Sequence, residues 1–355
     1  MQIDHRFQDL TGIDLPIVLA PMAGPGASGL AIAVAEAGGL GSLPCALMDD
    51  DRVKAEFGII RQRTAKPINL NFFCHQPARF DADREAGWRQ ALAPYYAEFG
   101  LDRDKVPSSD RKSFDAERCA LVEELRPGIV SFHFGLPEAS LLARVKAAGA
   151  RVMASATTVG EARWLEQAGC DLIIAQGFEA GGHRGMFLTR DINTQIGTMA
   201  LVPQVVDAVS VPVIAAGGIA DGRGIVAALA LGASAVQIGT AYLFCPEASV
   251  PPVHRRALRQ EAADNTALTN LFTGRPARGI MNRVMRELGP VSDNAPEFPL
   301  AGGALAPLRA ASEPSGSGDF MSLWSGQAAP LAVELPAGEL THRLWSQACT
   351  LLGSR

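Results

Sequence analysis

The sequence predicts a (β/α)8 barrel, the TIM-barrel fold, extended by an insertion after the third strand and by a C-terminal α/β cap segment. Eight short apolar runs recur along residues 17–238, helix-length stretches separate them, and the runs are nearly continuously apolar instead of alternating. Such runs are typical of parallel strands that helices cover on both faces. The predicted strands are residues 17–20, 40–42, 68–71, 129–132, 152–155, 172–175, 213–216 and 235–238.

Helical segments are expected in the connections between these strands. Three connections have clear helical length, and each is followed by a glycine, the residue that most often caps a helix C-terminus. Strand and helix units in this order favour a closed barrel over an open, doubly wound sheet. The three segments are residues 141–148, 159–168 and 223–231, followed by Gly149, Gly169 and Gly232.

Two parts of the chain interrupt the repeat. We expect a barrel formed by residues 1–75 and 113–245, and a cap or lid region formed by residues 76–112 and 246–355. Both extra parts follow C-terminal strand ends, so we expect them to cover the mouth of the barrel. Residues 301–318 contain few aromatic or β-branched side chains, which is the composition of a mobile segment.

The composition excludes several classes of protein. Hydrophobic residues make up 48% of the chain, charged residues 19%, and the net charge is only -5. A large core is therefore possible, whereas a disordered tail, a basic nucleic-acid-binding protein and a polyacidic protein are disfavoured. The longest apolar stretch, around residues 225–236, is shorter than the roughly 20 residues that a bilayer requires. We expect neither a nucleic-acid partner nor a membrane partner.

The N-terminal residues and the cysteines indicate the compartment. Asp4, Arg6 and Asp9 interrupt the apolar core that a secretory signal would need. The six cysteines are widely separated and have no CxxC spacing, which argues against both a zinc site and a disulfide framework. We expect a cytoplasmic protein with buried thiols and no bound metal.

The active site of such a barrel lies at the C-terminal ends of its strands. After the first strand, Ala20, Pro21, Met22 and Ala23 are small or compact enough for a flat ligand to lie against the backbone. At the end of the third strand, the amide of Asn71 can pair with the edge of a heterocycle. Both features also occur in ordinary strand-to-helix turns.

The fourth strand ends in Ser131 and His133, which are candidates for binding substrate. A single histidine near a strand end is more often structural than catalytic. The sequence therefore leaves open whether His133 contacts the substrate.

The loop after the sixth strand is the most informative run in the chain. Gln176 ends the strand, and Gly181, Gly182 and His183 follow within the run Glu-Ala-Gly-Gly-His-Arg-Gly. Paired glycines let the backbone approach a ligand closely, and the imidazole presents an ionisable group to it. We therefore predict that His183 is catalytic.

The last two strands predict a site for one phosphate group. Gly217 and Gly218 follow the seventh strand, before a helix that begins near Asp221, and Gly239 and Thr240 follow the eighth. Backbone N–H groups at such strand ends, a helix N-terminus and a threonine hydroxyl can together bind an anion. Paired glycine tips after the last two strands are the usual phosphate location in this fold.

These residues resemble the ordered motifs of the nitronate monooxygenase family, formerly called 2-nitropropane dioxygenases, from about residue 10 to residue 330. The runs Val-Ser-Phe-His-Phe-Gly and Glu-Ala-Gly-Gly-His-Arg-Gly are similar to those of the class that oxidises nitronates. The further motifs begin at Ala20, Asn69, Ala216, Gln237 and Trp324.

The resemblance implies a barrel that holds FMN without a covalent link. It implies that His183 is the catalytic residue. It also implies a flavin site formed by Asn71, Gln176, Gly181, Gly218 and the stretch Gln237, Ile238, Gly239 and Thr240.

The activity implied by the resemblance is the oxidation of an alkyl nitronate, such as propionate 3-nitronate, with O2 to a carbonyl compound and nitrite. A neutral nitroalkane would first lose a proton to His183, expected to act as a general base with a pKa near neutrality. A pre-formed nitronate would instead accept a hydrogen bond from His183.

Other activities remain open at this stage. A related FMN barrel that uses NAD(P)H, either a quinone reductase or an enoyl-acyl-carrier-protein reductase, would share the glycine pairs. An isomerase or aldolase that binds phosphate without a flavin is disfavoured, because no lysine and no pair of carboxylates ends a strand. A binding protein without catalysis is a further alternative, and monomer and homodimer are both open.

Overall fold

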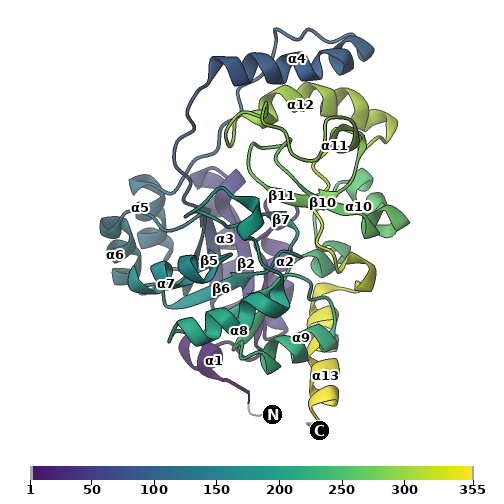
Figure 1. Ribbon diagram of the computed structural model, residues 1–355. Helices are drawn as coiled ribbons and strands as arrows, with labels where there is room; N and C mark the ends of the chain where they lie inside the picture. The colour runs from purple at the N-terminus through teal and green to yellow at the C-terminus, as the bar shows by residue number, and fades with distance from the viewer. Residues whose placement is uncertain (1–2, 354–355) are drawn as a thin grey trace.

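The computed structural model describes residues 3–353, and within them eight parallel strands surround a central axis (Figure 1). The strand order is β1-β9-β8-β6-β5-β4-β3-β2, and a parallel bridge between Val18 and Leu40 joins the two ends of the sheet. The predicted TIM barrel is therefore confirmed. Its strands are β1 Ile17–Leu19, β2 Gly41–Pro44, β3 Ile68–Phe73, β4 Ile129–His133, β5 Arg151–Ala156, β6 Leu172–Gln176, β8 Val213–Ala216 and β9 Ala235–Ile238.

Apolar side chains fill the N-terminal end of the barrel. Leu172 and Ile174 of β6, together with Ile214 of β8, belong to a buried cluster that Phe7 of the first helix completes. The opposite side chains of the strands pack against the surrounding helices in a larger core. Because one end is packed, a ligand cavity can form only at the C-terminal end.

Helices surround the barrel, as the sequence pattern predicts. Aspartate or threonine side chains accept hydrogen bonds from the first free backbone amides of α3, α5, α7 and α9, which explains where these helices begin. The helices around the barrel are α1 Arg6–Thr11, α2 Ser28–Glu36, α3 Asp50–Arg63, α5 Ala116–Leu125, α6 Ala139–Ala147, α7 Val159–Gln167, α8 Thr198–Ala208, α9 Gly222–Ala230 and α13 Ala337–Leu352.

Helix α13 lies beside α9, far from the mouth of the barrel (Figure 1). Its Thr341 hydroxyl lies 2.8 Å from the Tyr242 hydroxyl, and Gln347 accepts a hydrogen bond from the Gly222 amide at 3.2 Å. The sequence-based boundary assigns this helix to the cap, whereas in the structure it belongs to the outer layer of the barrel.

The remaining elements form a second layer over the mouth of the barrel, which we call the cap. It consists of α4 Ala82–Glu98, α10 Pro252–Arg259, β10 Thr266–Thr269, β11 Ala277–Ile280, α11 Arg283–Glu287 and α12 Ala301–Ser312. Short 3-10 helices complete the chain: η1 Cys45–Leu47, η2 Ile192–Thr194, η3 Thr240–Phe244, η4 Glu261–Asp264, η5 Glu313–Ser315 and η6 Ala329–Leu331.

The insertion and the C-terminal tail pack against each other in the cap, where α4 lies along α12 (Figure 1). Trp88 of α4 donates a hydrogen bond to the Ala301 carbonyl at 3.1 Å, and Tyr96 donates one to the Ala304 carbonyl at 2.7 Å. Residues 301–312 are thus an ordered helix, unlike the mobile segment expected from composition. Small residues at the start of α12 also admit the loop that follows α4, since a Cβ at Gly303 would meet the Pro107 carbonyl oxygen at 2.4 Å.

A two-residue strand, β7 Gly182–His183, joins the barrel to the cap. It pairs antiparallel with β11, which places His183 opposite Ala277 and Gly182 opposite Arg278. β11 also pairs with β10, so the loop after β6 is the edge strand of a three-stranded cap sheet. The sequence pattern did not predict this sheet, because two residues are too few to show a strand period.

The cysteines are free thiols, five of them buried and Cys349 half-buried, as expected. Burial raises the pKa of Cys45 and of Cys170 to about 12, so these thiols stay protonated and unreactive at neutral pH. Within residues 3–353, no helix has both the length and the apolar character needed to cross a membrane.

Candidate active site

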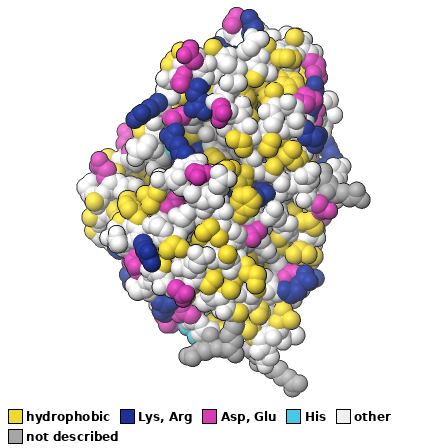
Figure 2. Space-filling model, viewed as in Figure 1, with side chains coloured by type: hydrophobic (Ala, Val, Ile, Leu, Met, Phe, Trp, Pro, Cys, Tyr) yellow, Lys and Arg dark blue, Asp and Glu magenta, His cyan; other side chains and the backbone are white. Residues whose placement is uncertain are grey.

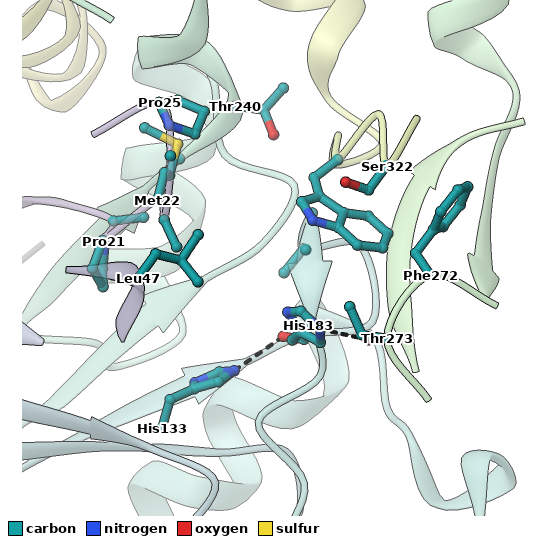
Figure 3. A pocket seen from close by; sticks show the side chains of 18 of the residues that line it. Pro21, Met22, Pro25, Leu47, His133, His183, Thr240, Phe272, Thr273 and Ser322 are labelled. Carbon is teal, nitrogen blue, oxygen red and sulfur yellow. Dashed lines mark hydrogen bonds between the residues drawn. The ribbon is translucent and has the colours of Figure 1, made fainter. Parts of the chain in front are cut away.

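A cavity of about 820 Å³ lies between the C-terminal strand ends of the barrel and the cap. Figure 3 shows side chains from both layers around it, including Met22 and Thr240 on the barrel side and Phe272 and Thr273 on the cap side. On the face shown in Figure 2, side chains of both charge signs are mixed with apolar ones.

The structure brings nearly all of the predicted site residues together around this cavity. Ser131 and Ile238 are the predicted residues that do not line it; both are buried, Ser131 beneath Asn71 and Ile238 in the barrel core. The predicted residues that line it are Ala20, Pro21, Met22, Ala23, Asn71, His133, Gln176, Gly181, Gly182, His183, Gly217, Gly218, Gln237, Gly239 and Thr240.

Backbone amides at the ends of β8 and β9 form one wall of the cavity. Gly217 and Gly218 have φ angles of 110° and 70°, in the left-handed region that favours glycine. Within the described residues, the amides of Gly217, Gly218, Gly239 and Thr240 donate no hydrogen bond. The Thr240 hydroxyl oxygen accepts from the Gly326 amide at 2.9 Å, which leaves its proton free for a ligand. This wall can bind an anion through neutral donors.

The N-terminus of α9 is already occupied, which differs from the sequence-based expectation. Asp221 accepts hydrogen bonds from the amides of Arg223 and Gly224 at 2.9 and 3.3 Å. Its carboxylate therefore satisfies the donors that an incoming anion would need. The amides of the strand ends, and not those of the helix N-terminus, are therefore the donors that remain free.

Two amide side chains present free polar groups to the cavity. Asn71 donates to the Ser131 hydroxyl at 2.9 Å, so its carbonyl oxygen remains available as an acceptor. The side-chain oxygen of Gln237 is buried and has no hydrogen-bond partner within the described residues. This oxygen is enclosed, whereas the NH2 group of Gln237 is not among the enclosed unpartnered atoms, so it is the end of this side chain that can pair with a ligand in the cavity.

Gln176 lines the cavity and also supports the loop that carries His183. Its oxygen accepts from the Gly185 amide at 2.7 Å, and its NH2 group donates to the His183 carbonyl at 3.0 Å. Both ends of the side chain are used to hold the His183 loop against the end of β6. Gln176 therefore shapes the cavity wall.

His183 stands on β7 in an aromatic environment. Its ring centroid lies 5.5 Å from that of Trp324 and 5.6 Å from that of Phe298. Its Nε2 atom lies 2.9 Å from the Thr273 hydroxyl, the contact drawn in Figure 3. Trp324 and Phe298 come from the C-terminal tail, so the cap encloses this imidazole.

Burial lowers the pKa of His183 to about 3, and the neighbouring His133, Arg275 and Arg111 lower it further by charge repulsion. The near-neutral pKa expected from the sequence is therefore not found in the ligand-free cavity. At pH 7 the ring is neutral and can accept a proton. A bound anion would raise the pKa of His183, because an opposite charge stabilises the imidazolium form.

His133 supports the backbone of His183. One of its ring nitrogens, Nε2, lies 3.2 Å from the His183 carbonyl oxygen, and the other, Nδ1, lies 3.0 Å from the Ser155 hydroxyl. A carbonyl oxygen can only accept, so His133 carries its proton on Nε2 and Ser155 donates to Nδ1. Burial lowers the pKa of His133 to about 4, and the ring is neutral at pH 7.

Arg184 holds the same loop from behind, fully buried. Its guanidinium donates to the carbonyls of Gly177 and Gln176, each at 2.6 Å, and to the Gln195 side chain at 2.8 Å. The arginine in the Gly-Gly-His-Arg-Gly run therefore fixes the end of β6 and does not line the cavity.

Thr273 and Phe298 are cap residues that the sequence did not place in the site; of the aromatic residues Trp88, Phe99 and Trp324 that it suggested for the pocket, Trp324 lines the cavity. Trp324 was part of a recognisable motif, whereas nothing in the local sequence around Thr273 or Phe298 distinguishes them from ordinary loop residues. Contact with His183 depends on how the tail folds back over the barrel, which short-range patterns do not show.

Comparisons with known proteins agree with one another. The family described as nitronate monooxygenase matches residues 4–347. A nitronate monooxygenase of Pseudomonas aeruginosa is 44% identical over 342 residues, covering 96% of this chain and 97% of the relative.

Solved structures show the same fold. Nitroalkane oxidase from Streptomyces ansochromogenes superposes with a TM-score of 0.89 at 39% identity, covering 98% of this chain and 99% of that one. A mutant of FabK from Thermotoga maritima is more distant, with a TM-score of 0.73 at 29% identity, covering 99% and 98% of the two chains.

Proposed function

The chain belongs to the nitronate monooxygenase family, and we propose that it uses FMN and O2 to oxidise alkyl nitronates, such as propionate 3-nitronate, to a carbonyl compound and nitrite. The observation that carries this proposal is a single cavity with two unlike walls. One wall offers free backbone amides to an anion, and the other presents the neutral imidazole of His183.

The cavity fits FMN by the chemistry of its donors. The amides of Gly217, Gly218, Gly239 and Thr240 and the Thr240 hydroxyl would hold one terminal phosphate. The carbonyl oxygen of Asn71 and the NH2 group of Gln237 would pair with polar edges of the ring. Bound FMN would supply the electron-transfer chemistry.

His183 would serve neutral and anionic substrates differently. For a neutral nitroalkane, the unprotonated ring accepts the α-proton as a general base. The resulting nitronate lies beside an imidazolium, and this pairing of opposite charges offsets the low pKa of His183 in the empty cavity. For a pre-formed nitronate the proton transfer is unnecessary, and the residue contributes to binding.

The cap would exclude bulk water from the reacting atoms. Phe298, Trp324 and Phe272 line the cavity on the cap side, and Phe272 packs edge-on against Trp324 with centroids 5.6 Å apart. Charges that develop in such an enclosed site interact more strongly than in water.

Oxygen uptake and nitrite release test the proposal. The same preparation receives propionate 3-nitronate in one assay and NADH in another, and its heat-released flavin is identified by chromatography. We expect FMN, with rapid oxygen uptake and nitrite release from the nitronate. A colourless protein that takes up no FMN, or rapid anaerobic bleaching by NADH with no nitrite from the nitronate, would overturn the proposal in favour of the alternatives.

A further inference from the structure

We infer that Thr273 is a positioning residue that fixes the protonation pattern of His183, so that the Nδ1 atom of this ring is the one that accepts the substrate proton. This inference rests on the proposed function, because it assigns an atom to the proposed proton transfer. Thr273 lies between β10 and β11 in the cap and is 90 residues from His183 in sequence.

The hydrogen bonds around the Thr273 hydroxyl favour one arrangement of protons. The oxygen lies 2.9 Å from Nε2 of His183, 3.4 Å from the Arg275 carbonyl oxygen and 3.4 Å from the Arg275 amide nitrogen. A hydroxyl has one proton to donate and can accept twice. The Arg275 carbonyl can only accept and the Arg275 amide can only donate.

One arrangement satisfies all of these groups. The hydroxyl donates to the Arg275 carbonyl and accepts both the Arg275 N–H and the Nε2–H of His183. The opposite arrangement, in which Thr273 donates to Nε2, leaves the Arg275 carbonyl without this donor. The network therefore assigns the His183 proton to Nε2, which leaves Nδ1 as an unprotonated acceptor.

The Nδ1 atom of His183 is open to the cavity. It has no hydrogen-bond partner within the described residues, yet it is not among the enclosed unpartnered polar atoms, unlike Nδ1 of His75. His183 lines the cavity. A substrate bound there can therefore reach Nδ1, whereas Nε2 faces the cap.

Thr273 would also stabilise the product of proton transfer. Once Nδ1 has accepted a proton, Nε2–H carries part of a positive charge, and its hydrogen bond to the Thr273 oxygen becomes charge-assisted. The charged neighbours of the ring, Arg275 and Arg111, are both cationic. Thr273 is thus the neutral acceptor that stabilises the imidazolium without requiring a nearby carboxylate.

The backbone around Thr273 is firmly held. Gly274 has a φ angle of 88°, and a Cβ at this position would lie 2.1 Å from the Pro296 carbonyl oxygen. Asn270 and Ser292 exchange two hydrogen bonds, at 2.8 and 2.9 Å. The hydroxyl is therefore presented to His183 by a tightly packed loop.

Substitution by valine, which has the same shape without the hydroxyl, tests the inference. We expect Thr273→Val to lower kcat/KM for freshly dissolved neutral nitroethane by about 10- to 100-fold, the value of a hydrogen bond to a charged group. Turnover of ethyl nitronate prepared in base should change by less than about 3-fold, because it needs no base. Thr273→Ser, which keeps the hydroxyl, should retain turnover of both substrate forms. Thr269→Val, an identical change at the end of β10 away from the cavity, is the matched control.

The possible results distinguish the two proposals. Equal losses on both substrate forms, or a serine variant as impaired as the valine variant, would overturn the role of Thr273. Absence of nitrite from the nitronate in the unaltered enzyme would instead overturn the proposed function, and the inference with it.

A measurement that does not depend on activity covers the case in which the valine variant fails to fold. Nitrogen NMR of the ¹⁵N-histidine-labelled protein, with His183 assigned by comparison with His183→Asn, reports which ring nitrogen carries the proton. We expect a neutral ring with the proton on Nε2. A ring protonated on Nδ1 would overturn the inference.

Discussion

The two walls of the cavity are built in different ways. The wall at the ends of β8 and β9 uses backbone amides, and its glycines follow their strands directly in sequence. The wall around His183 uses side chains, and their partners Thr273, Phe298 and Trp324 come from distant parts of the tail. The proposed anion site thus depends mainly on the barrel, whereas placement of the imidazole depends also on the cap.

The largest effect is expected from removing the imidazole. His183→Asn should lower turnover of neutral nitroalkanes by about 10²- to 10⁴-fold, the usual contribution of a positioned base, and affect pre-formed nitronates much less. Nitrite release from both substrate forms measures the difference, with His342→Asn on the exposed face of α13 as the control. Equal losses on both forms would mean that the side-chain wall acts in binding alone.

Destabilising the cap should affect its own helices and leave the wall at the ends of β8 and β9 intact. Trp88 is fully buried between α4 and α12, so Trp88→Ala should destabilise the cap by about 3–5 kcal/mol. Hydrogen exchange should accelerate in α4 and α12 and remain slow in β8 and β9, with flavin retained. Trp164→Ala, on the outside of the barrel, is the control. Uniform acceleration across both layers would show instead that cap and barrel unfold together.

A substitution in the wall of backbone amides should instead weaken FMN binding and leave the cap stable. An alanine at position 217 would have to adopt a φ angle of 110°, and its Cβ would lie 3.0 Å from the Ala180 amide nitrogen. We expect Gly217→Ala to weaken FMN binding by about 10- to 100-fold, which corresponds to about 1–3 kcal/mol of strain. Equilibrium dialysis with FMN measures the dissociation constant of the variant and of the unaltered protein.

Gly149→Ala is the control for Gly217→Ala, because it introduces similar backbone strain at a position that does not line the cavity. Gly149 has a similar φ angle of 95°, but its surroundings are open. If both variants lose FMN equally, the glycine tip is not a phosphate site.

The smallest effect concerns acid stability. His254 is buried, donates to the Trp324 carbonyl at 3.0 Å, and has its pKa lowered to about 4, chiefly by burial. Between about pH 6.5 and pH 4 the unfolded chain binds a proton at this residue that the folded chain does not. Stability should therefore fall as the pH falls through this window, by at most about 1.4 kcal/mol per pH unit.

Melting temperatures at pH 5, 6 and 7 check the contribution of His254. His254→Gln keeps a donor for the Trp324 carbonyl but does not titrate, so its melting temperature should depend less on pH. Parallel curves for the variant and the unaltered protein would assign the acid sensitivity to other groups.

The same division explains what could be predicted from the sequence. Strand positions and glycine tips follow from apolar runs and the residues next to them, so all eight barrel strands were located. Thr273 and the β7–β11 pairing could not be found in this way, because each joins segments about 90 residues apart. The low pKa of His183 could not be predicted for the same reason, because Phe298 and Trp324, which help to bury its ring, come from the distant tail.

His183 lies on an edge strand of the cap sheet, so a movement that opens the cavity would also disturb the position of the imidazole. Opening the cap would either break the β7–β11 ladder or pull the imidazole away from the barrel wall. In the reaction proposed above, either movement would take His183 out of position, so proton abstraction would require an intact β7–β11 ladder.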